Sequence, residues 1–143
     1  LVDDSIVRGN TSREIVQMAR EAGARRVYLA SAAPPVRFPN VYGIDMPTRQ
    51  ELIASDRSDE EICAEIGADA LIYQDLDALK AAVQAVNPAL SRFETSCFDG
   101  IYITGDVTAE YLSSVEIRRG SAPRMASDDA DVAQLDLNLV LAP

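Results

Sequence analysis

The chain has 143 residues, of which 48% are hydrophobic and 25% charged, the balance of one ordinary globular domain. Its formal net charge of −10 argues against nucleic acid as a partner, because phosphate backbones need a basic surface. The sequence contains no histidine, the commonest general base and zinc ligand. It also contains no apolar run of the roughly 18 residues that a membrane helix needs, so we expect no membrane partner.

The chain opens on two aliphatic residues, Leu1 and Val2, followed at once by two aspartates and a loop. Two aliphatic residues are too few for a strand, so we expect this segment to be the end of a strand truncated at its N-terminus. Residues 11–14 have the Thr-x-x-Glu spacing of a helix capping box. Gly23 is a stop signal for that helix. Its apolar residues recur at helical spacing: Ile15, Met18, Ala19 and Ala22.

Strand and helix patterns then alternate along the chain. We expect strands over 27–32, which is apolar enough to be buried, and over 40–47, 70–75 and 100–105. Capping boxes at 48–51 and 58–61 predict two short helices. Two further helices are expected over 76–86 and 108–118, the first with Leu79, Val83 and Val86 facing inward.

The alternation predicts an α/β fold in which helices flank a parallel sheet. We expect residues 1–119 to be the C-terminal part of a domain that is truncated at its N-terminus, with a helical C-terminal region. Residues 120–143 are polar and acidic apart from alternating leucines near the end, and we expect a disordered tail there unless another subunit covers it. Ligands of such sheets sit beyond the carboxyl ends of the strands, which is where the opening segment lies.

The opening segment combines two kinds of ligand-binding group. Asp3 and Asp4 leave the strand end and can accept from hydroxyl groups or hold a metal. Residues 9–12 open a helix, whose free N–H groups and positive dipole end attract an anion. Gly9 permits close approach, and the Thr11 and Ser12 hydroxyls add donors. A sugar phosphate has this layout, with hydroxyls at one end and phosphate at the other; the alternative is a capped helix after a solvated acidic turn.

Charge and motif comparisons narrow the ligand further. Residues 1–26 hold five basic and four acidic residues, whereas the remainder holds eight and nineteen, so an anion is best tolerated near the opening segment. A Walker loop needs Gly-Lys-Ser/Thr, but Asn10 follows Gly9 here. A dinucleotide fingerprint needs three glycines, and this loop has one.

Three segments resemble one family in the same order. VDDSIVRGNTS resembles the phosphoribosyl pyrophosphate (PRPP) motif of type I phosphoribosyltransferases. Together with VYLASAAPPVRFPNVYGIDMPTRQELIA and SCFDGIYITGDV, it resembles the C-terminal part of amidophosphoribosyltransferase, from residue 1 to about residue 112. The resemblance implies a type I phosphoribosyltransferase fold and the first step of purine synthesis, in which ammonia from glutamine displaces pyrophosphate from C1 of PRPP.

The resemblance also implies residue roles. Asp3 and Asp4 would serve the ribose hydroxyls and Mg²⁺. The 5-phosphate would be held, mainly through backbone N–H groups, by Ser5, Ile6, Val7, Arg8, Gly9, Asn10, Thr11 and Ser12. Several related transferases carry an acidic residue where this chain has Val7. Because ammonia arrives with a free lone pair, no base is needed, and we expect no catalytic acid or base in this chain.

The chain departs from the family pattern at two places. Asn10 stands where Thr is usual, a mild change if backbone N–H groups bind the phosphate. Some family members hold a [4Fe–4S] cluster on four cysteines, but Glu94 and Asn40 occupy two of those positions here, beside Cys97. We therefore expect no iron–sulfur cluster and a packing role for Cys97. The two thiols, Cys63 and Cys97, are expected to stay reduced in a cytoplasmic protein.

Some interpretations stay open. We expect the glutaminase domain to lie outside these residues, and we therefore expect them to be inactive alone. Purine nucleotides as feedback inhibitors and a homo-oligomer are further expectations from the family. The alternatives are a non-catalytic PRPP- or nucleotide-sensing regulator and a salvage phosphoribosyltransferase. Arg37, Phe38 and Asp45 are expected either to line the site or to serve core, loop or interface roles.

Overall fold

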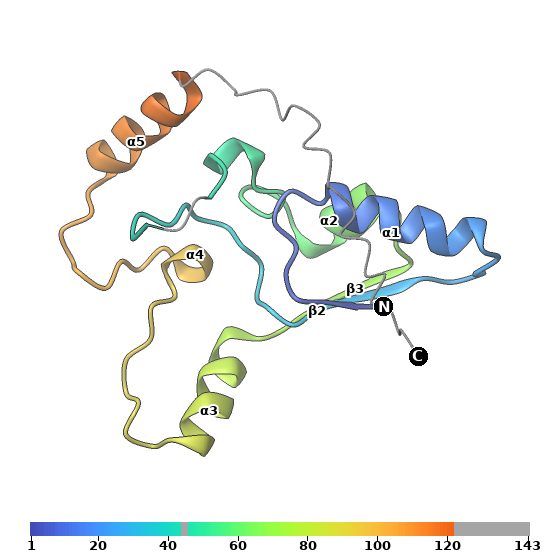
Figure 1. Cartoon of the computed structure of the whole chain (residues 1–143), viewed down its shortest axis with the longest axis horizontal. Helices are drawn as coiled ribbons and strands as arrows, with labels where there is room; N and C mark the ends of the chain where they lie inside the picture. Colours follow the sequence, from blue (N-terminus) through green and yellow to red (C-terminus); the bar gives the residue numbers. More distant parts are fainter. Residues whose placement is uncertain (44–45, 122–143) are drawn as a thin grey trace, which may run out of the picture.

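The computed structural model describes residues 1–43 and 46–121. Figure 1 shows the elements in chain order: β1 (Val2–Asp3), α1 (Asn10–Glu21), β2 (Tyr28–Ser31), the 3₁₀ helix η1 (Arg49–Glu51), α2 (Asp59–Ile66), β3 (Ala70–Tyr73), α3 (Leu76–Val86), α4 (Ser96–Asp99) and α5 (Ala109–Ser121). Asp45 and the tail expected from residue 120 lie outside the described residues, except that α5 includes residues 120 and 121.

The three strands form a parallel sheet in the order β1-β2-β3, which confirms the predicted fold class. Val2 pairs with Ala30 of β2, and Ala30 pairs in turn with Ile72 of β3. Helices α1 and α2 pack against each other beside this sheet, and α2 also contacts β3 (Figure 1). The sheet therefore places the end of β1, and the loop after it, next to the start of α1.

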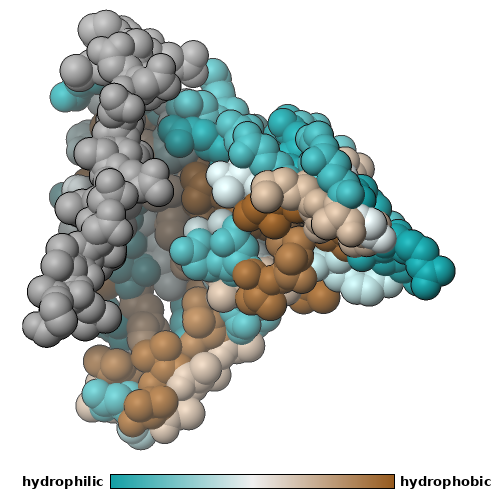
Figure 2. Space-filling view, turned by 45° about the vertical axis from the view of Figure 1, so that its right-hand side comes forward, coloured by the Kyte–Doolittle hydropathy of each residue, from teal (hydrophilic) through white to brown (hydrophobic). Residues whose placement is uncertain are grey.

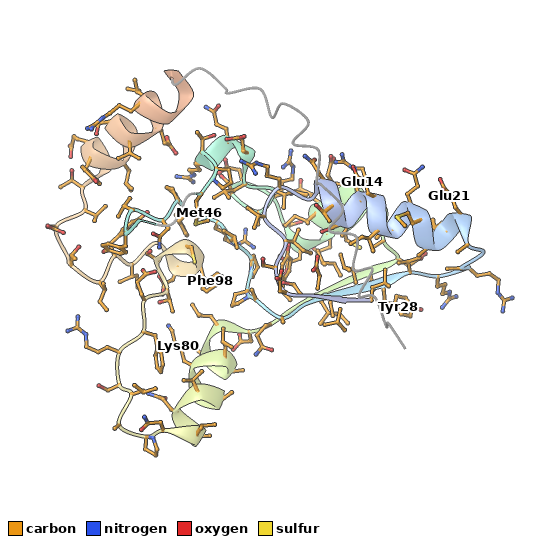
Figure 3. The ribbon with its side chains drawn as sticks, in the orientation of Figure 1. Glu14, Glu21, Tyr28, Met46, Lys80 and Phe98 are labelled. Atoms are coloured by element: carbon orange, nitrogen blue, oxygen red, sulfur yellow. The ribbon has the colours of Figure 1, made fainter. Side chains whose placement is uncertain are left out.

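The core lies between the sheet and these helices. Its buried members are Ile6, Leu29, Ile53, Ala54, Ile62 and Ile66, with Leu71 and Tyr73 packed against them. Along β2 burial alternates, because successive side chains point to opposite faces. Leu29 is buried, whereas Tyr28 is half exposed. In Figure 3, Glu14 and Glu21 point outward from α1, and Tyr28 lies on the other side of the sheet. The strand expected to be buried over 27–32 is therefore buried on one face only, and the prediction is wrong for the face that carries Tyr28.

Two expected strands are absent from the described residues. Residues 40–43 and 46–47 form a loop, and residues 101–105 form a turn. Side chains rather than a strand ladder hold these segments together. The Tyr102 hydroxyl donates to the Pro39 carbonyl at 2.7 Å, and the Tyr42 and Thr104 hydroxyls lie 3.0 Å apart. No neighbouring strand pairs with either segment, so their apolar residues pack as loops.

The helix bounds follow the predictions more closely than the helix faces do. α3 spans residues 76–86 as expected, but it has no buried residue, and Val86 is 88% exposed. Figure 2 shows hydrophobic surface at the lower end of the molecule, where α3 lies. In α1, Ser12 and Val16 are buried and Met18 is exposed, so the apolar residues at helical spacing do not all lie on the buried face. None of the described helices is long and apolar enough to cross a membrane.

Candidate anion-binding site

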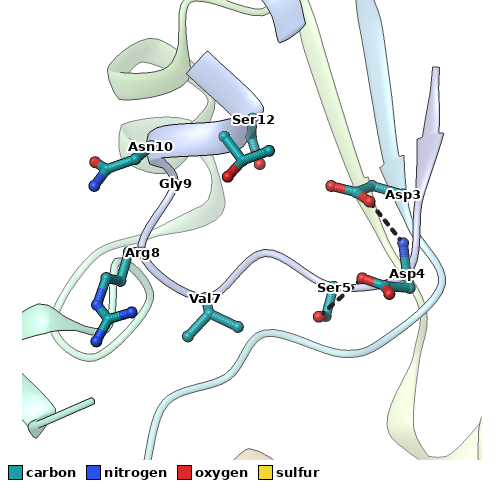
Figure 4. Close-up of a pocket in the computed structure, with 9 residues that line it drawn as sticks. Asp3, Asp4, Ser5, Val7, Arg8, Gly9, Asn10 and Ser12 are labelled. Atoms are coloured by element: carbon teal, nitrogen blue, oxygen red, sulfur yellow. Dashed lines mark hydrogen bonds between the residues drawn. The ribbon is translucent and has the colours of Figure 1, made fainter. Parts of the chain in front are cut away.

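A cavity of about 350 Å³ opens between the carboxyl end of β1 and the N-terminus of α1 (Figure 4). One continuous segment of the chain lines it. The lining residues are Asp3, Asp4, Ser5, Val7, Arg8, Gly9, Asn10, Thr11 and Ser12. These are nine of the ten residues that the sequence placed in a PRPP site. The structure therefore brings the expected binding residues together around one space.

The tenth residue, Ile6, takes a different position. Its side chain is 1% exposed and belongs to the hydrophobic core with Leu29 and Ile53. Only its backbone can serve a ligand. The side chain instead anchors the loop to the core, because burying an Ile side chain is worth about 1.5–3 kcal/mol relative to leaving it exposed.

Asp3 and Asp4 form the acidic wall of the cavity. Asp3 is the last residue of β1, and its Oδ1 accepts from the Asp4 backbone N–H at 3.0 Å. The Ser5 hydroxyl donates to Asp4 Oδ1 at 3.2 Å. Figure 4 shows the Asp3 carboxylate directed toward the start of α1 and that of Asp4 lying beside Ser5. Both carboxylates keep acceptor capacity, since a carboxylate has about four lone-pair sites.

The opposite wall is the N-terminus of α1, where one sequence prediction is wrong. The helix begins at Asn10, so Thr11 and Ser12 lie in its first turn and no capping box forms at residues 11–14. The N-cap is Gly9, with φ 78° and ψ −5°, and no side chain caps the helix. The first turn contains no acidic residue. Its backbone N–H groups and dipole therefore favour an anion.

Tertiary packing explains the glycine. A Cβ at position 9 would lie 2.4 Å from Ile53 Cδ1, and the positive φ itself disfavours any residue with a side chain. The Ile53 N–H also donates to the Val7 carbonyl at 2.9 Å. Ile53 thus contacts the loop at Val7 and at Gly9, the residues on either side of Arg8.

Arg8 adds positive charge at the edge of the cavity. Its Nε lies 3.5 Å from Glu51 Oε1, and its side chain is about half exposed. Figure 4 shows the guanidinium turned outward, away from the two aspartates. Sequence reasoning interpreted residues 48–51 only as a helix start and missed both Glu51 and Ile53. No signal in the sequence links residues 51–53 to the loop, because that contact is long-range.

The chemistry of the cavity fits Mg²⁺. Magnesium prefers oxygen ligands and is usually held by one or two carboxylates plus substrate phosphates. Asp3 and Asp4 supply two carboxylates beside the anion site. The described residues contain no group of three acidic, cysteine or histidine side chains that could hold a metal unaided. A metal at this site would therefore need oxygen ligands from its substrate or from water.

The positions that the resemblance connects with an iron–sulfur cluster also meet in the structure. Asn40 is fully buried and donates to Glu94 Oε2 at 3.1 Å, while Glu94 Oε1 accepts from the Ser96 N–H at 2.9 Å. The Cys97 carbonyl accepts from the backbone N–H groups of Arg37 and Phe38. Burial, reinforced by the Glu94 carboxylate, raises the pKa of the Cys97 thiol.

Arg37 and Phe38 lie away from the cavity lining. The Arg37 Nη1 donates to the carbonyls of Ala54 at 2.7 Å and Arg57 at 3.1 Å. The Phe38 ring packs against the backbone at Gly100. Both residues therefore hold loops together, which is the core-and-loop role among those expected.

Comparisons with known proteins found similar sequences and structures, although no family model matches the chain. It is 57% identical over 131 residues to the amidophosphoribosyltransferase of Pasteurella multocida. That match covers 91% of this chain and 26% of the relative. The chain thus spans about a quarter of the length of the curated relatives it matches.

Two solved structures have a similar fold. One is the glutamine PRPP amidotransferase from Bacillus subtilis, described as complexed with ADP and GMP, with a TM-score of 0.61 and 42% identity. The match covers 78% of this chain and 25% of the B. subtilis chain. The other is described as the allosteric regulatory enzyme of purine biosynthesis, with a TM-score of 0.66, 42% identity, and coverage of 80% and 25%.

Proposed function

Since the chain is homologous over most of its length to part of the amidophosphoribosyltransferases, we propose that it supplies the PRPP-binding part of such an enzyme. The complete protein would transfer ammonia from glutamine to C1 of PRPP, with release of pyrophosphate and formation of 5-phosphoribosylamine. One observation carries the proposal: a single cavity has two carboxylates on one wall and an uncapped helix N-terminus on the other. PRPP has matching ends, a ribose with hydroxyls and a 5-phosphate.

This geometry supports the binding roles that the resemblance implies. Asp3 and Asp4 would accept from the ribose hydroxyls and would hold Mg²⁺ through their oxygens. The N–H groups at the start of α1 and the Thr11 and Ser12 hydroxyls donate to the 5-phosphate. The backbone of residues 5–9 completes the loop around it. Bound Mg²⁺ would supply positive charge against the departing pyrophosphate.

The residues of this site act by binding and orientation rather than by proton transfer. Val7 lines the cavity, and the family resemblance puts it where several related transferases carry an acidic residue. Ammonia already has a lone pair, so attack on C1 needs no base. The rate enhancement then comes from holding the ribose in place and from stabilising charge as the C1–pyrophosphate bond breaks.

The proposal includes partners beyond PRPP. Glutamine would supply ammonia through a part of the enzyme that lies outside these residues. Purine nucleotides would act as feedback inhibitors, in keeping with the nucleotides and the allosteric regulation named for the two similar structures. We further propose a homo-oligomer in the cytoplasm, where unpaired thiols such as Cys63 and Cys97 stay reduced.

The test uses the complete protein and ammonia in place of glutamine. Replacing both Asp3 and Asp4 by Asn should lower ammonia-dependent release of pyrophosphate from PRPP by about a hundredfold or more, because the site loses its charged hydroxyl and metal ligands. Glu60→Gln, a change at an exposed carboxylate of α2, is the control and should leave this rate within twofold. Equal rates in the double variant and the wild type would contradict the assigned roles. PRPP binding without any turnover would instead favour a non-catalytic sensor.

A further inference from the structure

Three consecutive loop residues, 7–9, contact residues 51–53 at the end of η1. The Val7 carbonyl accepts from the Ile53 N–H at 2.9 Å, and the backbone of Gly9 packs against the Ile53 side chain. Between them, Arg8 Nε lies 3.5 Å from Glu51 Oε1. The loop and this segment are far apart in sequence, so tertiary structure alone brings them together.

The carboxylate of Glu51 is itself held in place. Its Oε2 accepts from the Thr48 backbone N–H at 3.0 Å and from the Thr48 hydroxyl at 2.9 Å. The bond from the Thr48 backbone N–H is part of the capping box that starts η1. One oxygen of Glu51 is therefore used to cap the helix, and the other reaches the loop. The side chain is also one-third exposed, which leaves it within reach of solvent but not free to turn.

The contact with Arg8 uses the inner nitrogen of the guanidinium. Nε is the guanidinium nitrogen that lies 3.5 Å from Glu51, and Nη1 and Nη2 lie at the outer end of this side chain, which lines the cavity. Those two nitrogens form the planar fork that binds a phosphate group bidentately. An ion pair this exposed contributes little to folding. The effect of Glu51 is thus expected in the orientation of Arg8 rather than in stability.

We propose that Glu51 is a positioning residue of the PRPP site: it holds Arg8 through Nε so that Nη1 and Nη2 can bind a phosphate group of PRPP. This inference rests on the proposed function and adds a residue outside the opening segment to it. The phosphate group is either the 5-phosphate or the pyrophosphate, since both present the same oxygens.

The decisive variant is Glu51→Gln in the complete protein. Glutamine can keep its oxygen toward Thr48 and retain the cap, but its uncharged amide no longer attracts Arg8. The KM for PRPP should rise about threefold to fivefold, the effect of losing one exposed ion pair, while kcat stays within twofold. Thr48→Val is the matched control. It removes the hydroxyl that binds Glu51 but keeps the bond from the Thr48 backbone N–H, so the carboxylate stays beside Arg8 and the KM for PRPP should stay within 1.5-fold.

A double variant separates positioning from a purely structural role. In an Arg8→Ala background, adding Glu51→Gln should change the KM for PRPP by less than 1.5-fold, because the group it orients is gone. Full additivity of the two changes, or an equal effect of Glu51→Gln and Thr48→Val, would overturn the inference.

Direct binding measurements identify the phosphate group. Ribose 5-phosphate and pyrophosphate are titrated separately into the wild type and into Glu51→Gln. A weaker affinity of the variant for one of them supports the inference and names the group that Arg8 binds; unchanged affinity for both overturns it. Failure of the wild type to bind PRPP would instead contradict the proposed function itself.

Discussion

The N-termini of α1 and α2 belong to two helices that pack against each other, yet they are built in opposite ways. α2 has Ser58 as its N-cap, whose hydroxyl accepts from the Glu61 N–H at 3.2 Å, while Glu61 accepts from the Ser58 N–H at 2.7 Å. Three acidic residues occupy its first turn. α1 has Gly9 as its N-cap, no side-chain cap and no acid in its first turn.

The contrast shows how one helix end is closed and the other is left open for a ligand. The positive dipole end of α2 is neutralised by its own carboxylates. The pKa of Glu60 lies below its ordinary value because a backbone N–H at residue 60 and the Ser58 hydroxyl bind its carboxylate. At α1 the same donors remain for an external anion. A substitution that closes α1, or opens α2, tests this difference.

The largest effect is expected from Gly9→Ala. The left-handed backbone at Gly9 costs a residue with a side chain about 1–2 kcal/mol, and the new Cβ would overlap Ile53 Cδ1. We expect the free energy of unfolding to fall by more than this and the affinity for PRPP to fall at least about tenfold, since the loop must move. Denaturant unfolding and calorimetric titration with PRPP measure the two effects.

Gly67→Ala is the matched control for that change. Gly67 also has a left-handed backbone, with φ 75°, but a Cβ added there would lie an ordinary 4.0 Å from the nearest atom, Val16 Cγ1. This variant should lose stability through the backbone alone and bind PRPP as the wild type does. A loss of PRPP affinity at Gly67 equal to that at Gly9 would mean that the site responds to stability rather than to loop geometry.

A smaller effect with opposite signs is expected from Asn10→Asp. A carboxylate at the first position of α1 gives it the charge pattern of α2 and should stabilise the fold by about 0.5 kcal/mol through the dipole. The same charge repels phosphate, so the affinity for PRPP should fall about fivefold to tenfold. Thermal unfolding and PRPP titration at one ionic strength check both signs. Tighter PRPP binding would contradict an anion site at this helix end.

The smallest changes are expected from a pair of hydroxyl deletions. Ser58→Ala removes the cap of α2 and should lower the free energy of unfolding by about 1 kcal/mol without changing PRPP affinity. Thr11→Ala should do the reverse: stability changes by less than about 0.5 kcal/mol, because Thr11 caps nothing, and PRPP affinity falls about threefold. Equal stability losses in both variants would show that Thr11 has a capping role after all.

The sequence was a good guide wherever the interaction is local. The capping boxes at Thr48 and Ser58 form as predicted, since each joins residues three apart. α3 has its predicted bounds, beginning after the cap that Asp75 provides through the Ala78 N–H. The grouping of residues around the cavity was also predictable in outline, because all nine lining residues fall within the ten-residue stretch 3–12.

The wrong predictions share a cause: each concerns a feature that depends on contacts between distant parts of the chain. Periodicity cannot tell whether a partner covers an apolar face, so the inward face assigned to α3 is wrong. The apolar residues near Tyr42 and Tyr102 suggested strands. The structure instead holds these segments through the two tyrosine hydroxyls, which bond to groups far away in the sequence. At α1, the Thr-x-x-Glu spacing was present, yet no capping box formed there.

By itself, then, the sequence determined the parallel α/β arrangement, the local caps and the grouping of carboxylates and anion donors in one short segment. The tertiary structure decided where α1 begins, because Ile53 packs against the backbone of Gly9 and excludes a side chain there. It also decided that Glu51 meets Arg8. Local hydrogen bonds are encoded within a few residues, whereas packing and charge contacts depend on which surfaces the fold brings together.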